Sequence, residues 1–327
     1  MRLRVLDGGQ LRAILSYEVM QDALRAAMVA ASQGHCVMPL RSGVMLPNDR
    51  GVLAMMPGYL GSSDVAGIKL ISLVPPGRRG GRSSHLGLML LYDAEGLQPV
   101  AMLCGSTLTS LRTAAVTALA TDVLARREVD VLAILGTGEQ AHAHVLALAK
   151  VRRFSEIRIW GRSEPRASEL VRALSAQGMN SLRVCTSVAA AVTDADVICT
   201  VTSASTPVLP GALVHRGAHV NLVGACTRDA AEADGVLVGR ATFFVDSRVS
   251  AMAQAGELLQ AIATGEAAES TIAAEIGEVL CGAHPGRTSS SEITVYKSLG
   301  IAAQDLAVAY SAYRLAESRG VGALVSV

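Results

Sequence analysis

The stretch VLAILGTGEQA, residues 131–141, decides the fold of this chain. Its apolar first half predicts a buried strand, and Gly136 and Gly138 then match the turn that holds the pyrophosphate of a dinucleotide. The first glycine permits a tight turn, and the second lets a phosphate approach the backbone. Ala141 stands where a third glycine is usual, because a small residue suffices for the helix to pack on the strand. Free N–H groups at the start of that helix favour an anion. We therefore predict a dinucleotide site at Gly136, Thr137, Gly138, Glu139, Gln140 and Ala141.

Strands and helices alternate around this turn. The predicted strands are Val129–Leu135, Ile157–Trp160, Leu182–Cys185, Val197–Thr200, His219–Val223 and Thr242–Val245, and the predicted helices are Leu111–Ala125, Glu139–Lys150 and Pro165–Ala176. Such alternation is typical of a doubly wound parallel sheet, the Rossmann arrangement.

The first third of the chain shows a different pattern. A helix is predicted over Tyr17–Ser32, followed by short strands at Val37–Arg41, Val52–Pro57, Gly67–Val74, Leu86–Tyr92 and Val100–Leu103. Turn-forming residues separate these strands, which favours a mainly antiparallel α+β unit. An Ala-rich helix over Ser298–Ala316 is expected to return to this unit. The fold class is therefore α/β, with an α+β domain over 1–116 plus a C-terminal helix in 300–327, and a Rossmann domain over 117–299.

The end of the second Rossmann strand indicates which cofactor binds. An acidic residue that would bind the ribose 2′-hydroxyl of NAD is expected there, about 20 residues after the glycines. The sequence has Gly161, Arg162 and Ser163 instead. Arg162 can pair with a 2′-phosphate and Ser163 can hydrogen-bond to it, which favours NADP over NAD. The alternative is a solvated arginine in a turn.

Composition excludes several classes of protein. Of the 327 residues, 50% are hydrophobic and only 17% are charged, which excludes a disordered chain. A net charge of +1 gives no electrostatic basis for binding nucleic acid or an anionic membrane surface. No apolar stretch is long enough to span a bilayer. The 6 cysteines contain no CxxC pair, so we expect reduced thiols in a cytoplasmic protein.

A metal site is not expected. His142 and His144 are two positions apart on a predicted helix, so their side chains diverge. His215 and His219 have ligand-like spacing but lack a third partner.

Four ordered motifs resemble the ornithine cyclodeaminase/mu-crystallin family over nearly the whole chain. They are SLRTAAVTALA at 110–120, LGTGEQA at 135–141, NLVGA at 221–225 with acidic residues following, and TVYKSLG at 294–300 continuing into Gln304-Asp305-Leu306. The resemblance implies a homodimer that pairs sheets of the first domain, the substrate-binding and dimerisation domain, and a Rossmann domain that binds the nicotinamide cofactor.

Members of this family act on small amino or imino acids. We therefore expect an NAD(P)H-dependent oxidoreductase that reduces a carboxylated imine or oxidises the corresponding amino acid at Cα. One alternative is an ornithine or lysine cyclodeaminase that uses bound NAD and releases ammonia. A second alternative is an NADPH-dependent ligand-binding protein without turnover.

The resemblance also implies roles for individual residues. Arg112 and Arg41 are expected to bind the substrate carboxylate, for which a planar guanidinium is suited. Lys69, within an apolar strand, is expected to polarise the C=N group, bind the carboxylate or supply a proton. Lys297 and Ser298, at an expected helix start, are predicted to line the cofactor site. The remaining predicted cofactor contacts are Ser84, Thr113, Val201, Thr202, Val223, Gly224 and Ala225.

Cys226 departs from the family pattern. Cyclodeaminases of the family carry an aspartate two positions after the glycine that corresponds to Gly224, and this aspartate acts as a base. A neutral thiol cannot easily take that role, and Asp229 lies further along the loop. The departure argues against ornithine cyclisation and leaves hydride transfer intact.

Overall fold

The computed structural model describes residues 2–48, 50–75 and 85–326. The chain divides into two compact units, Met1–Val116 with Gly300–Val327 and Thr117–Leu299. The division falls inside the long helix α3 (Gly105–Leu124). In the described part of the chain, no helix is both long enough and apolar enough to cross a membrane.

The second unit is built on an eight-stranded sheet in the order β10-β9-β8-β11-β12-β15-β13-β14. Every pairing in this sheet is parallel. Its strands are β8 (Val131–Leu135), β9 (Glu156–Trp160), β10 (Leu182–Val184), β11 (Val197–Thr200), β12 (His219–Leu222), β13 (Thr242–Val245), β14 (Ile272–Glu275) and β15 (Thr294–Lys297). The predicted doubly wound parallel sheet is confirmed. Because β8 and β11 are neighbours, the strand order reverses between them, and ligands bind at such a point in open α/β sheets.

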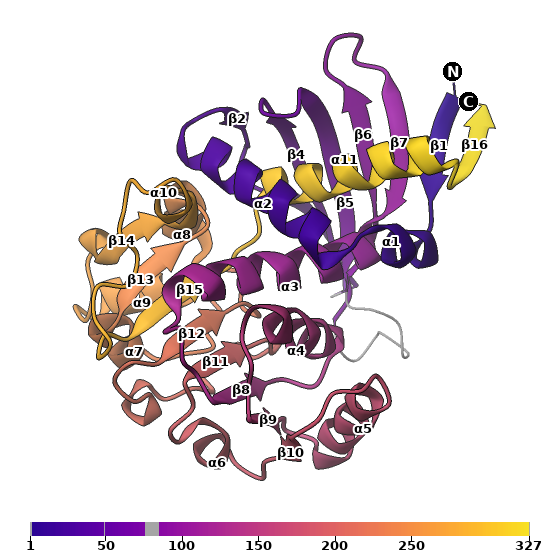
Figure 1. Ribbon diagram of the computed structural model, residues 1–327. Helices are drawn as coiled ribbons and strands as arrows, with labels where there is room; N and C mark the ends of the chain where they lie inside the picture. Colours follow the sequence, from indigo (N-terminus) through magenta and orange to yellow (C-terminus); the bar gives the residue numbers. More distant parts are fainter. Residues whose placement is uncertain (1, 49, 76–84, 327) are drawn as a thin grey trace. The chain divides into compact units, whose positions relative to one another are not determined.

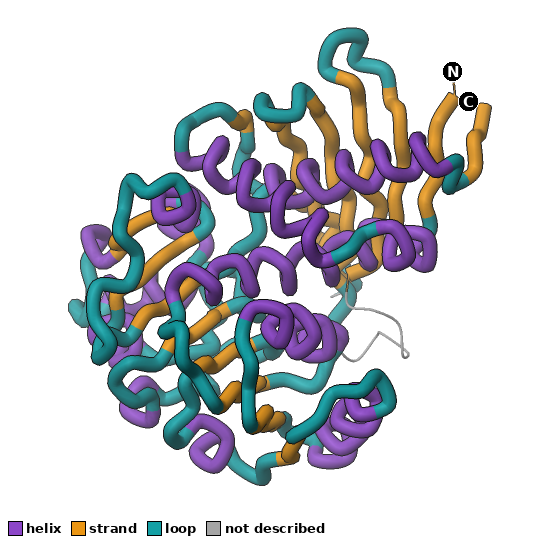
Figure 2. The backbone as a smooth tube through the Cα atoms, viewed as in Figure 1, coloured by secondary structure: helices purple, strands orange, loops and turns teal. Residues whose placement is uncertain are grey.

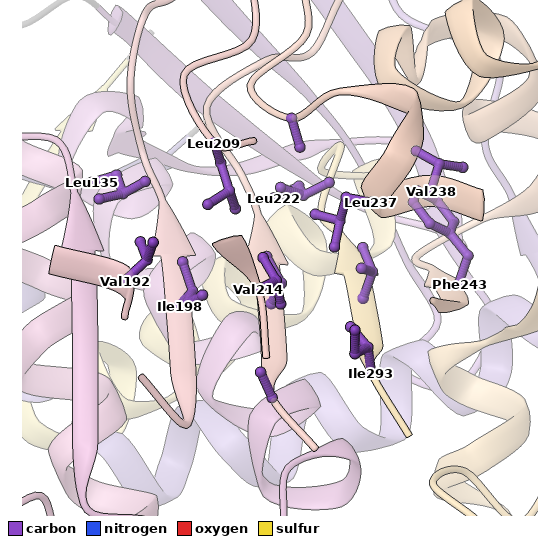
Figure 3. Close-up of a cluster of buried hydrophobic side chains, with 14 of the residues drawn as sticks. Leu135, Val192, Ile198, Leu209, Val214, Leu222, Leu237, Val238, Phe243 and Ile293 are labelled. Atoms are coloured by element: carbon purple, nitrogen blue, oxygen red, sulfur yellow. The ribbon is translucent and has the colours of Figure 1, made fainter. Parts of the chain in front are cut away.

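The connecting helices of this unit lie between successive strands. They are α4 (Glu139–Val151), α5 (Glu164–Ser175), α6 (Val188–Val192), α7 (Gly235–Arg240), α8 (Arg248–Gln254), α9 (Gly256–Ala263) and α10 (Ile276–Leu280). Figure 3 shows one apolar cluster in which Ile198, Leu222 and Phe243 of three strands gather with Val192 and Leu237 of two helices. All five side chains are fully buried, so apolar burial fixes these helices on the sheet.

The first unit is built on a second eight-stranded sheet, in the order β16-β1-β7-β6-β5-β4-β2 with β3 paired to β4. Its strands are β1 (Arg2–Leu6), β2 (Cys36–Val37), β3 (Ser42–Leu46), β4 (Gly51–Leu60), β5 (Val65–Leu73), β6 (His85–Asp93), β7 (Pro99–Cys104) and β16 (Ala323–Ser326). The sheet is antiparallel except where β1 pairs with β7. Figure 2 shows these strands together with the helices of the unit.

Helix α11 (Ala302–Arg319) packs on β4, β5 and β6 of this sheet and on α2 (Tyr17–Ser32), while α1 (Gly8–Ile14) lies at its side (Figure 1). The approach of α11 to the sheet is close at Gly67 of β5, where a Cβ atom would lie 2.9 Å from a methyl carbon of Leu306. Glycine at this position therefore lets the first turn of α11 approach the middle of β5.

Several predicted boundaries are wrong. Val37–Arg41 is not one strand, because Pro39 cannot donate to the ladder, and β2 ends at Val37 while β3 starts at Ser42. The C-terminal helix does not extend over 300–327: it ends at Arg319, where Gly320 follows with a left-handed φ of 65°, and β16 comes next.

The start of that helix was also misplaced. Lys297 is the last residue of β15, and α11 begins only at Ala302. Helix α3 begins six residues before the predicted start at Leu111, at Gly105.

Candidate active site

Three buried charged side chains meet inside the first unit. Lys69 of β5, Arg112 of α3 and Asp305 of α11 are each no more than 5% exposed. The Lys69 Nζ atom lies 2.7 Å from Oδ2 of Asp305, and Arg112 Nε lies 2.9 Å from Oδ1. A buried carboxylate thus bridges two buried cations, and this pairing is what makes the burial of the charges tolerable.

Local structure explains how these groups meet. Lys69 occupies the same strand face as Gly67 and Ile71, as the period-two spacing predicts, and this face is the buried one. Gly67 brings the first turn of α11 close to β5, and Asp305 lies in that turn. The glycine two residues before Lys69 therefore helps to place the carboxylate beside the ammonium.

The charges shift the proton affinity of the cluster. Burial lowers the pKa of Lys69 to about 8, and the positive charges of Arg112 and Arg41 act in the same direction against the attraction of Asp305. Burial by itself would raise the pKa of Asp305, but the charges of Arg112 and Lys69 outweigh it and hold this pKa below its usual value. At neutral pH the cluster therefore holds an ionised carboxylate and a lysine whose proton is only moderately tightly bound.

The two predicted carboxylate-binding arginines are held by the start of α11. Arg112 donates from one Nη atom to the side-chain oxygen of Gln304 at 2.8 Å, and Arg41 donates to the carbonyl of Gly300 at 3.0 Å. Within the described part of the chain, the second Nη atom of Arg112 has no hydrogen-bond partner, so it remains available to a ligand oxygen.

The glycine turn has the geometry that a dinucleotide needs. Gly136 has φ of 136°, and a Cβ atom there would lie 2.8 Å from the carbonyl of Val201, so glycine is required. A Cβ atom on Gly138 would meet nothing within 4 Å, which leaves space beside the backbone. No side chain caps the start of α4 at Gly138, so its N–H groups face this space without a side-chain partner.

The other predicted cofactor residues of the second unit follow the carboxyl ends of its strands. Gly161, Arg162 and Ser163 follow β9, Val201 and Thr202 follow β11, and Val223, Gly224 and Ala225 follow β12. Arg162 is exposed and makes no hydrogen bond or ion pair with the described residues. Ser163 is the first residue before α5, and its side chain does not cap that helix. Both side chains remain available to a phosphate.

Lys297 and Ser298 lie at the carboxyl end of β15. The Lys297 Nζ atom is fully buried and donates to the carbonyl of Ala225 at 2.6 Å and to Glu257, whose carboxylate lies 2.8 Å away. Ser298 is 2% exposed, and its hydroxyl has no partner among the described residues. An orphaned hydroxyl and an open glycine turn at one edge of the sheet fit a polar cofactor.

Two further predicted cofactor residues are Thr113 and Ser84. Thr113 is buried in the α3 segment of the first unit. Ser84 lies outside the described residues. Cys226, the departure from the family pattern, is half-buried in the loop after β12.

Asp305 and Gln304 were not among the predicted site residues. The available signal was Asp305 itself, a lone acidic residue in the apolar run 299–313 of the C-terminal motif. Such a residue in a buried helix needs a cationic partner.

The doubly wound parallel sheet with its glycine turn places the second unit in the Rossmann class of dinucleotide-binding folds. The sequence profile of the ornithine cyclodeaminase/mu-crystallin family matches residues 9–320, and the chain belongs to this family.

Named relatives show the same relationship. The chain is 38% identical over 314 residues to the ketimine reductase mu-crystallin of Mus musculus, with 92% of this chain and 96% of the relative covered. It is 32% identical over 319 residues to a Delta(1)-pyrroline-2-carboxylate reductase of Bacillus cereus, with 97% and 98% covered. The solved Delta(1)-pyrroline-2-carboxylate reductase of Thermococcus litoralis, in complex with NADH and L-proline, superposes with a TM-score of 0.95 at 29% identity, covering 99% of this chain and 100% of that one.

Proposed function

We propose that this protein is an NAD(P)H-dependent imine reductase whose substrate is a small ketimine that carries a carboxylate next to its C=N carbon. The buried cluster of Lys69, Asp305 and Arg112 is the observation on which this proposal rests, because it offers a guanidinium for the carboxylate and an ammonium for the nitrogen. The relatives named for ketimine and pyrroline-2-carboxylate reduction support the substrate class.

Arg112, together with Arg41, binds the substrate carboxylate in this proposal. The free Nη atom of Arg112 supplies one charge-assisted hydrogen bond, while Asp305 and Gln304 hold the rest of the guanidinium in place. Such fixed positioning orients the C=N carbon for reaction.

Lys69 supplies the proton. When bound, the reduced nicotinamide provides the hydride that goes to the C=N carbon, and the nitrogen of a neutral imine must gain one proton. A lysine with a pKa near 8 is well matched to donate that proton at neutral pH. Asp305 keeps the ammonium in position and stabilises its charged form.

Among the cofactors, we propose NADPH as the preferred donor. Arg162 and Ser163 support this choice, because both lie after β9 without other partners where the 2′-phosphate of NADP binds in Rossmann folds. The solved reductase of Thermococcus litoralis contains NADH, so the preference for NADPH over NADH is supported by the turn after β9 alone. Replacing Arg162 tests it directly.

We also propose a homodimer formed through the sheet of the first unit. Exposed apolar side chains on its strands support this assembly, namely Val44, Met45, Leu46, Leu53 and Leu88. Light scattering of the purified protein tests it.

All 6 cysteines are free, which fits a reducing cytoplasmic environment.

The decisive experiment follows nicotinamide absorbance with NADPH or NADH and a panel of carboxylated imines. Five- and six-membered cyclic ketimines and keto acids mixed with ammonia or methylamine make up the panel. Rapid cofactor oxidation is expected, and Arg112→Ala should remove most of it. Ammonia release from ornithine with NAD, without net cofactor change, would instead establish a cyclodeaminase. Tight ligand binding without turnover on any substrate would establish a binding protein.

A further inference from the structure

Another buried carboxylate lies in the Rossmann unit, in direct contact with residues that the sequence predicted to bind the cofactor. Glu232, in the segment between β12 and α7, is fully buried. Its two oxygens accept hydrogen bonds from five donors, which come from four residues. They are Thr200 Oγ1 (2.8 Å), Thr202 N (2.7 Å), Thr202 Oγ1 (2.8 Å), Gly224 N (2.6 Å) and Ala225 N (3.3 Å).

These donors belong to two different loops. Thr200 and Thr202 are at the carboxyl end of β11, and Gly224 and Ala225 follow β12. The loops approach so closely that a Cβ atom on Gly224 would lie 2.1 Å from the carbonyl of Thr202 and 2.5 Å from Glu232 itself. Glu232 therefore links the two loops, in addition to the hydrogen bond from Thr200 Oγ1 to the carbonyl of Asn221 (3.4 Å).

Lys297 holds the same loop from another direction. Its Nζ atom binds the carbonyl of Ala225, while Glu232 binds the N–H of that residue. Glu257 of α9 accepts from Lys297 and also from the backbone N–H of Glu232. The peptide groups on both sides of Ala225 thus have their orientation fixed by buried charged groups.

We propose that Glu232 is a positioning residue for the nicotinamide cofactor, because its carboxylate fixes the shape of both loops at the carboxyl ends of β11 and β12. This inference rests on the proposed function, in which Val201, Thr202, Val223, Gly224 and Ala225 contact the cofactor. The location supports it, since β11 borders the point where the strand order reverses and where ligands bind in open α/β sheets.

Glu292 provides a matched comparison in the same unit. This glutamate also holds a loop through its carboxylate, accepting from Thr288 and Ser289, and it also accepts from Thr242. It lies just before β15, and Thr242 begins β13, so it acts at the amino ends of the strands. Glu292 is partly exposed whereas Glu232 is fully buried, so the comparison controls for the loss of a loop-holding carboxylate at the opposite edge of the sheet.

The test compares Glu232→Gln with Glu292→Gln. Glutamine keeps the shape but presents an NH₂ group to donors, so at least one charge-assisted hydrogen bond is lost. The dissociation constant of NADPH, measured by its fluorescence in the absence of substrate, should rise about tenfold or more in Glu232→Gln. Glu292→Gln should leave it unchanged. In the cofactor-free proteins, backbone hydrogen exchange of residues 200–204 and 223–226 should be faster in Glu232→Gln than in the wild type, and unchanged in Glu292→Gln.

Other outcomes overturn the inference. Wild-type cofactor affinity in folded Glu232→Gln, or equal weakening in Glu292→Gln, would show that Glu232 has only a structural role. If Glu232→Gln does not fold, Thr200→Val removes a single donor and should weaken NADPH binding a few-fold, and unchanged binding would refute the inference. If the wild-type protein reduces imines and Glu232→Gln binds the cofactor normally, this inference is refuted and the proposed function stands. A wild-type protein that binds neither NADPH nor NADH refutes the proposed function as well.

Discussion

Replacing Asp305 by asparagine tests the buried charge cluster most directly. The substitution keeps the size of the side chain but removes the negative charge that lies 2.7 Å from Lys69 and 2.9 Å from Arg112. Removing one partner of a buried ion pair costs about 3–5 kcal/mol, because the remaining charges stay buried without compensation. Asparagine retains one acceptor oxygen, so we expect a loss of unfolding free energy of about 3 kcal/mol.

The same substitution should change the pH dependence of activity. Asp305 is the neighbour that raises the pKa of Lys69, whereas burial, Arg112 and Arg41 lower it. Without the carboxylate, the pKa of Lys69 falls below its value of about 8. The lysine then loses its proton at lower pH, so the decline of kcat/KM for imine reduction should begin at lower pH than in the wild type.

Urea unfolding at pH 7 and kcat/KM measured from pH 6 to pH 10 provide the two readouts. Glu317→Gln serves as the control, since Glu317 lies on the same helix in an exposed pair with Arg314, and such pairs contribute little. If Asp305→Asn unfolds too readily to assay, the double variant Lys69→Met/Asp305→Asn should recover part of the stability, because it removes one buried cation with the anion. Wild-type stability together with a wild-type pH profile in Asp305→Asn would refute the reasoning.

Three further results are expected. In the wild type, kcat/KM for imine reduction should fall as pH rises above about 8, because Lys69 loses its proton there. Lys69→Met should remove most of the activity and abolish this decline at high pH. A decline that persists in Lys69→Met would assign it to another group. In steady-state kinetics with both cofactors, Arg162→Ala should raise KM for NADPH about ten- to a hundredfold and leave KM for NADH unchanged. An equal effect on the two KM values would mean that no 2′-phosphate binds at Arg162. Gly67→Ala should lower the unfolding free energy by about 1–3 kcal/mol, because the new methyl group would meet Leu306 and the carbonyl of Leu90. If calorimetry shows no loss of stability, α11 can move away from β5 without cost.

The sequence alone determined the class of fold and the conformation of the glycine turn after β8. The run from Val131 to Ala141 specifies a strand, a turn and the start of a helix by local signals. These signals are the apolar residues of the strand, the positive φ that requires Gly136, and the start of α4 directly after Gly138. The period-two geometry of a strand likewise places Lys69 on one face with Gly67 and Ile71, and the structure shows that this face is the buried one. These signals are local, so the order of residues is sufficient to reveal them.

Only the tertiary structure decided which charges meet. Asp305 is 236 positions after Lys69 and 193 after Arg112, and no spacing rule connects residues that far apart. The packing of α11 on β5 at Gly67 brings the carboxylate to both cations. In the same way, Glu232 finds its hydrogen-bond donors in two loops whose ends meet because β11 and β12 are parallel neighbours. Buried ionic groups are set by such long-range packing, since each is tolerated only where the folded chain supplies its partner.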